Sequence, residues 1–89
     1  MEIMKNATAG TMESSDVYVE VEPNDAGLEL ELESVVMAQF GQAIRETVQQ
    51  VLHECGVEKA KVRVVDRGAL ECVIRARVET AVIRGKGEA

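Results

Sequence analysis

The 89-residue sequence has few aromatic residues, with one tyrosine, one phenylalanine and no tryptophan. Its hydrophobic core must therefore be aliphatic, and an apolar share of 46% suffices for one small core. We expect a single domain over residues 1–89. Because side chains that stack on bases are scarce and the net charge is −6, we expect no nucleic-acid partner.

Cysteine, histidine and long apolar runs are also scarce. Cys55 and Cys72 do not have the Cys-x-x-Cys spacing, and the first ten residues lack the apolar segment of a signal peptide. No run approaches the roughly 18 apolar residues of a membrane-spanning helix. We therefore expect a cytoplasmic protein with reduced thiols, no metal site and no membrane contact. The single histidine, His53, is expected at a solvated helix end.

Charge is divided unevenly along the chain. Residues 1–58 contain twelve acidic and two basic side chains, whereas residues 59–89 contain four acidic and eight basic ones. The basic residues are spread over several expected elements. We interpret them as an ion-paired, solvated face that complements the acidic part, rather than as a phosphate-binding patch.

Alternating apolar and polar residues predict three strands. Val17 to Glu22 alternates valine with polar residues, and Leu28 to Glu33 alternates leucine with glutamate. The turn formers of Pro23 to Gly27 lie between them, so we expect a hairpin with an acidic outer face. Lys59 to Val65 alternates again and predicts a third strand, which a helical crossover would bring beside the first.

Apolar residues at intervals of three and four predict a long amphipathic helix from Val35 to Cys55, with Ser34 as its N-cap and Gly56 as its stop. Its predicted buried stripe consists of Val36, Met37, Phe40, Ile44, Val48, Val51, Leu52 and Cys55. The segment from Leu70 to Val82 fits both a helical and a two-residue period. We favour a helix there, and the alternative is a strand over 69–75 followed by a short helix.

These elements predict the α+β class. We expect a small single domain in which an antiparallel or mixed sheet of three or four strands packs against one long helix and a C-terminal helix, in the order β-β-α-β-α. Residues 1–13 show no sustained periodicity, and we interpret them as a flexible N-terminal arm.

No residue pattern predicts a catalytic site. The glutamates at 29, 31 and 33 alternate with leucines, which indicates a solvent face rather than a dry cleft. Ser14 and Ser15 have no basic partner nearby in the sequence, so we expect no intrinsic enzymatic activity. Such serines can accept a covalent group, or their hydroxyls can bond nearby backbone in a turn. The alternative function is a small non-catalytic α+β protein-interaction or regulatory module.

Four segments point to one family. They are the Ala-Gly-Thr-x-Glu-Ser-Ser-Asp sequence of Ala9 to Asp16, Gln39-Phe40-Gly41, the run from Asp66 to Cys72, and Arg75 to Val78. With the Met-Glu start, the chain resembles the acyl carrier protein (gamma) subunit of citrate lyase along almost its whole length.

This resemblance implies that Ser14 is covalently joined, through a phosphodiester, to 2′-(5″-phosphoribosyl)-3′-dephospho-coenzyme A. The thiol of that group carries acetyl and citryl thioesters. The implied partners are an alpha subunit (acyl transferase), a beta subunit (citryl lyase) and a prosthetic-group transferase, and the complex cleaves citrate to oxaloacetate and acetate. Strand alternation extended back from Val17 adds the expectation that Ser14 faces outward and Ser15 inward.

Overall fold

The structure is a computed structural model that describes residues 2–87. Its six elements follow the expected β-β-α-β-α order, preceded by one further strand. In chain order they are β1 (Ala7–Gly10), β2 (Val17–Pro23), β3 (Leu28–Ser34), α1 (Met37–Glu54), β4 (Ala60–Asp66) and α2 (Glu71–Gly85). The α+β class is confirmed, and so is the choice of a helix for the segment after residue 70.

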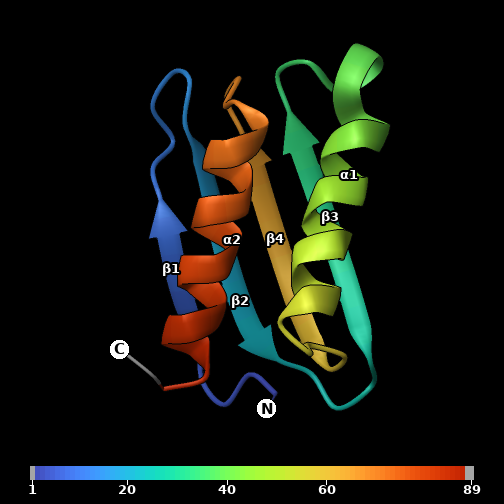
Figure 1. Ribbon diagram of the computed structural model, residues 1–89, viewed down its shortest axis with the longest axis vertical. Coiled ribbons are helices and arrows are strands. Elements are labelled where there is room, and N and C mark those ends of the chain that lie inside the picture. The colour runs from blue at the N-terminus through green and yellow to red at the C-terminus, as the bar shows by residue number, and fades with distance from the viewer. Residues whose placement is uncertain (1, 88–89) are drawn as a thin grey trace.

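The strands form one mixed sheet in the order β1-β2-β4-β3 (Figure 1). Strand β4 is antiparallel to β2 and parallel to β3. The predicted third strand therefore lies beside the first, as expected, but the predicted hairpin is wrong because β4 separates its two strands. This order suits the charges of the strands, since the Arg63 guanidinium of β4 lies 3.5 Å from Glu20 of β2 and 3.9 Å from Glu31 of β3. Two acidic strands paired with each other would instead oppose like charges.

Strand β1 corrects the prediction of a flexible arm. Ala7–Gly10 pairs antiparallel with β2, with Ala9 opposite Val19. The preceding segment is also bonded, because the Met4 N–H donates to the Gly85 carbonyl at 2.8 Å and the Glu2 carboxylate accepts from two backbone N–H groups. Short strands of small residues lack the apolar alternation that reveals longer ones. Met1, the first residue of the predicted arm, lies outside the described residues.

Both helices cover the same face of the sheet (Figure 1). The core between the two layers is aliphatic, and its fully buried members include Val19, Val48, Leu52, Val64 and Val78. The C-terminal part of the predicted stripe on α1 is confirmed, since Ile44, Val48, Val51 and Leu52 are all buried.

The N-terminal part of that stripe is wrong for Met37 and Phe40, which are exposed, whereas Val36 is partly buried against the core. Helix α1 begins at Met37, and Phe40 is 54% exposed. Ser34 is the last residue of β3 rather than the N-cap, a position taken by Val36. The Ser34 hydroxyl instead donates to the Asp66 carboxylate at 2.8 Å and accepts from the Val36 N–H. Helix α1 therefore projects its first turn past the sheet, where apolar side chains remain exposed.

Candidate functional site

Three loops meet at one end of the sheet, opposite the end where the chain begins (Figure 1). They are residues 11–16 between β1 and β2, residues 35–36 between β3 and α1, and residues 67–70 between β4 and α2. The last strand joins them. The Asp66 carbonyl accepts from the Val35 N–H at 3.2 Å, and the Arg67 carbonyl accepts from the Ser15 N–H at 2.8 Å. The predicted site residue, Ser14, lies in the first of these loops.

Ser14 and Ser15 are the two central residues of a tight turn. The Asp16 N–H donates to the Glu13 carbonyl at 3.2 Å, and Ser15 has φ of +65°. A positive φ at the third residue of a four-residue turn is characteristic of type II geometry, which serine adopts at a cost. The serines therefore do not continue strand β2. The prediction that alternation separates an outward Ser14 from an inward Ser15 is wrong, because both side chains are exposed.

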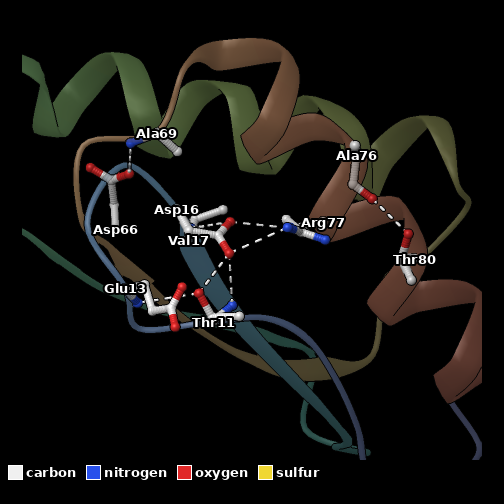
Figure 2. Close-up of polar contacts among 9 residues, drawn as sticks. All are labelled: Thr11, Glu13, Asp16, Val17, Asp66, Ala69, Ala76, Arg77 and Thr80. Atoms are coloured by element: carbon white, nitrogen blue, oxygen red, sulfur yellow. Dashed lines mark hydrogen bonds and ion pairs between the residues drawn. The ribbon is translucent and has the colours of Figure 1, made fainter.

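Asp16 organises this loop (Figure 2). One carboxylate oxygen accepts from the Thr11 hydroxyl at 2.7 Å and from the Thr11 N–H at 3.1 Å. The other accepts from the Val17 N–H at 2.8 Å and from Nε of Arg77, on α2, at 3.1 Å. Charge-assisted bonds of this kind are stronger than neutral ones. The serine turn is thus held against the C-terminal helix, although both serines remain exposed.

The Asp16 contacts predict a pH-dependent stability. The pKa of Asp16 is lowered from 3.8 to about 2, first by the Thr11 hydroxyl, then by the Val17 N–H, and further by Arg77. Because the folded-state pKa is depressed, this stabilisation is present above about pH 4 and is lost as the pH falls toward 2. We expect Asp16→Asn to lower the free energy of unfolding at pH 7 by about 1–3 kcal/mol. The variant's free energy of unfolding should also fall less steeply than the wild type's as the pH is lowered from about 4 toward 2. Urea unfolding at several pH values measures both.

Asp25→Asn is the matched control, because Asp25 is exposed in the turn before β3. This control is expected to keep both the neutral stability and the acid decline of the wild type. An Asp16→Asn variant whose stability falls as steeply as the wild type's between pH 4 and 2 would contradict the assignment.

Gly10 allows the loop to close. Its φ is +84°, and a Cβ added there would lie 1.8 Å from the carbonyl oxygen of Val17. We expect Gly10→Ala to destabilise the protein by about 3 kcal/mol, as the sum of left-handed strain and overpacking. Gly56→Ala separates the two effects, because Gly56 has φ of +73° with no heavy atom within 4 Å of the added Cβ. An equal loss in both variants, measured by denaturant unfolding, would show that the close contact has no effect.

The serine turn has a free nucleophile and no base to activate it. We find no hydrogen bond to either serine hydroxyl among residues 2–87. The single histidine, His53, lies in the last turn of α1, which runs away from this end of the sheet (Figure 1). Within the same residues, no three histidine, cysteine, aspartate or glutamate side chains gather to hold a metal ion. Nucleophilic catalysis by serine requires such a base, and we find none bonded to this turn within residues 2–87.

Sequence reasoning singled out the serine pair, but it predicted neither the turn nor the residues that hold it. Arg77 is 61 positions away from Asp16 in the chain, and no local pattern links the two. The helical period of α2 could at most have placed Arg77 on its exposed side.

Comparisons with known proteins identify the class. The family model described as "ACP: Malonate decarboxylase delta subunit (MdcD)" matches residues 4–85. This is an acyl carrier family, and its members hold a covalently attached prosthetic group. A carrier role agrees with an exposed serine that has no base.

Curated relatives give the particular family. The chain is 56% identical over 85 residues to the citrate lyase acyl carrier protein of Escherichia fergusonii, a match that covers 94% of this chain and 88% of that protein. It is 49% identical over 88 residues to that of Latilactobacillus sakei, covering 99% and 87%. The chain belongs to the citrate lyase acyl carrier protein family, and it is a carrier rather than a catalytic subunit.

A solved structure has the same fold. One chain of the crystal structure of a Pseudomonas malonate decarboxylase hetero-tetramer in complex with malonate aligns with a TM-score of 0.75 at 20% identity, covering 86% of this chain and 79% of that one. Among the described residues, neither helix is long and apolar enough to span a membrane.

Proposed function

We propose that this protein is the acyl carrier subunit of a citrate lyase and that Ser14 is the residue to which its prosthetic group is attached. The group is 2′-(5″-phosphoribosyl)-3′-dephospho-coenzyme A, joined through a phosphodiester by a dedicated transferase. The partners are an alpha subunit that transfers acyl groups and a beta subunit that cleaves the citryl thioester. The protein functions in the cytoplasm, in keeping with the two free cysteines, Cys55 and Cys72.

The observation that supports this proposal is the exposed turn of Glu13 to Asp16, whose backbone is fixed while its serine hydroxyls remain free. Attachment through a phosphodiester requires one oxygen nucleophile that a modifying enzyme can enclose, and Ser14 fits that requirement. The exposed hydroxyl of Ser15 fits it as well, so the choice of Ser14 rests on the family resemblance.

The chain's own residues supply attachment and position. When bound, the group supplies a thiol that carries acetyl and citryl residues as thioesters. Asp16, Thr11 and Arg77 keep the attachment point at a defined place on the surface. Tethering raises the local concentration of the thiol at each partner subunit, so that reaction does not depend on free diffusion.

Intact mass spectrometry tests the proposal. The protein should be purified from cells that produce the whole complex and the modifying enzyme, so that attachment can occur. We expect a mass that exceeds the sequence mass by one nucleotide-containing thiol group, and peptide mapping should locate that group on Ser14. An unmodified chain from such cells would favour the alternative of a plain interaction module, and a group on Ser15 would overturn the site assignment.

A further inference from the structure

An apolar groove lies between the first turns of the two helices, at the same end of the sheet as the serine turn. It has a volume of about 350 Å³, within the range of small-molecule sites. Its walls include Phe40 and Ala43 from α1, Leu70 from the loop before α2, and Ile74 from α2. Phe40 and Leu70 are 54% and 72% exposed, respectively. Large apolar side chains left open around a hollow indicate a binding surface.

The lining of the groove includes one threonine whose hydroxyl has no hydrogen bond within the described residues. Thr47 lines the groove and is only 8% exposed. The comparable Thr80 of α2 donates to the carbonyl four residues earlier at 2.9 Å, whereas we find no hydrogen bond to the Thr47 hydroxyl within residues 2–87. Every fully buried side-chain oxygen or nitrogen in that range has a partner, so the Thr47 hydroxyl is not completely buried. Buried polar groups normally find a partner, and a ligand can provide one.

The groove and the serine turn both contact the segment of residues 66–68. Asp66 is one of the lining residues, and both of its carboxylate oxygens accept hydrogen bonds, from the Ser34 hydroxyl and the Ala69 N–H. The backbone carbonyl of the next residue, Arg67, accepts a hydrogen bond from the Ser15 N–H. Gly68, the next residue, again lines the groove. The backbone next to Ser14 is therefore bonded to the same short segment, residues 66–68, that contributes Asp66 and Gly68 to the groove.

We propose that the groove binds the thiol-terminated arm of the prosthetic group when the carrier is not engaged with a partner subunit. The inference rests on the proposed attachment at Ser14. An arm derived from coenzyme A ends in a chain of alternating methylene and amide groups, which suits apolar walls with one free hydroxyl. The larger hollow, about 490 Å³, does not suit it, because it lies on the uncovered sheet face among charged residues such as Glu20, Lys61 and Arg63.

Nuclear magnetic resonance of the isolated, loaded carrier tests this docking. Amide shifts of the loaded protein are compared with those of unmodified Ser14→Ala. We expect differences at Ala43, Thr47 and Ile74 as well as beside residue 14, and none at the far end of α1. Ala43→Leu fills the groove from an exposed helical position and should remove the differences at Thr47 and Ile74. Ala38→Leu is the matched control, since Ala38 is exposed on the same helix and does not line the groove.

Alkylation of the prosthetic thiol gives a second measurement. Docking for most of the time should slow its reaction with iodoacetamide about three- to tenfold, in proportion to the undocked fraction. We expect Ala43→Leu to restore the faster rate and Ala38→Leu to keep the slow one, with mass spectrometry distinguishing this thiol from Cys55 and Cys72.

The outcomes separate this inference from the proposed function. A carrier that is loaded on Ser14 but shows unchanged groove resonances would overturn the docking and leave the proposed function intact. Groove shifts that appear only when a partner subunit is added would make the groove a subunit-docking surface, which also overturns it. A chain without any group on Ser14, from cells that produce the complex, would overturn both.

Discussion

Ser14→Ala is expected to abolish citrate cleavage by the assembled complex while the carrier stays folded. The side chain is exposed and we find no hydrogen bond to its hydroxyl within the described residues, so its removal costs little stability. Without the oxygen, no phosphodiester can form, and the partner subunits have no tethered thiol to use. Intact mass should show the bare sequence mass, and the rate of oxaloacetate formation should fall to background.

Ser15→Ala is the matched control for this loss. It shares the turn and the exposure of Ser14, and it should still gain the prosthetic group and support cleavage. Ser15→Gly is a second control, because glycine adopts the positive φ of 65° at this position without strain. It should be modified and should be about as stable as the wild type or slightly more so. An active Ser14→Ala complex would overturn the assignment.

Leu52→Ala is expected to cause the largest loss of stability, about 2–5 kcal/mol. Leu52 is the largest side chain with essentially no exposure, and it is part of the core between α1 and the sheet. Its truncation leaves a cavity that the surrounding valines cannot fill, because β-branched side chains have few alternative rotamers. Urea unfolding monitored by circular dichroism measures the change in the free energy of unfolding.

Phe40→Ala provides the contrast within the same helix. Both residues belong to the stripe that periodicity predicts to be buried, yet Phe40 is 54% exposed in the structure. We expect its truncation to change the free energy of unfolding by less than about 1 kcal/mol, the range for surface positions. If the two variants were equally destabilised, the first turn of α1 would have to pack against the sheet in solution.

Periodicity predicted most elements because it depends on local geometry. The valines of β2 and β4, the leucines of β3 and the stripe of Ile44 to Leu52 show the period of the structure in which they are found. Strand β1 escaped prediction because Ala-Thr-Ala-Gly has only one buried side chain, Ala9, to reveal a period. Its pairing with β2 is a tertiary effect, stabilised by backbone bonds that any sequence can form.

Strand order could not be read from the chain. Turn formers between β2 and β3 predicted a hairpin, but β4 lies between these two strands and places Arg63 near Glu20 on one side and Glu31 on the other. The exposure of the first turn of α1 was not predicted for a related reason. Helical periodicity does not show how far a helix extends beyond the sheet that it covers.

The sequence by itself determined the serine pair, the acidic strands, the α+β class and the family, because each depends on residue identity or local spacing. Only the tertiary structure decided that Asp16 is held by Arg77, that Gly10 must lack a side chain, and that Phe40 and Leu70 border one groove. Those features depend on which surfaces meet when the helices pack on the sheet, and contacts between residues 61 positions apart leave no trace in local periodicity.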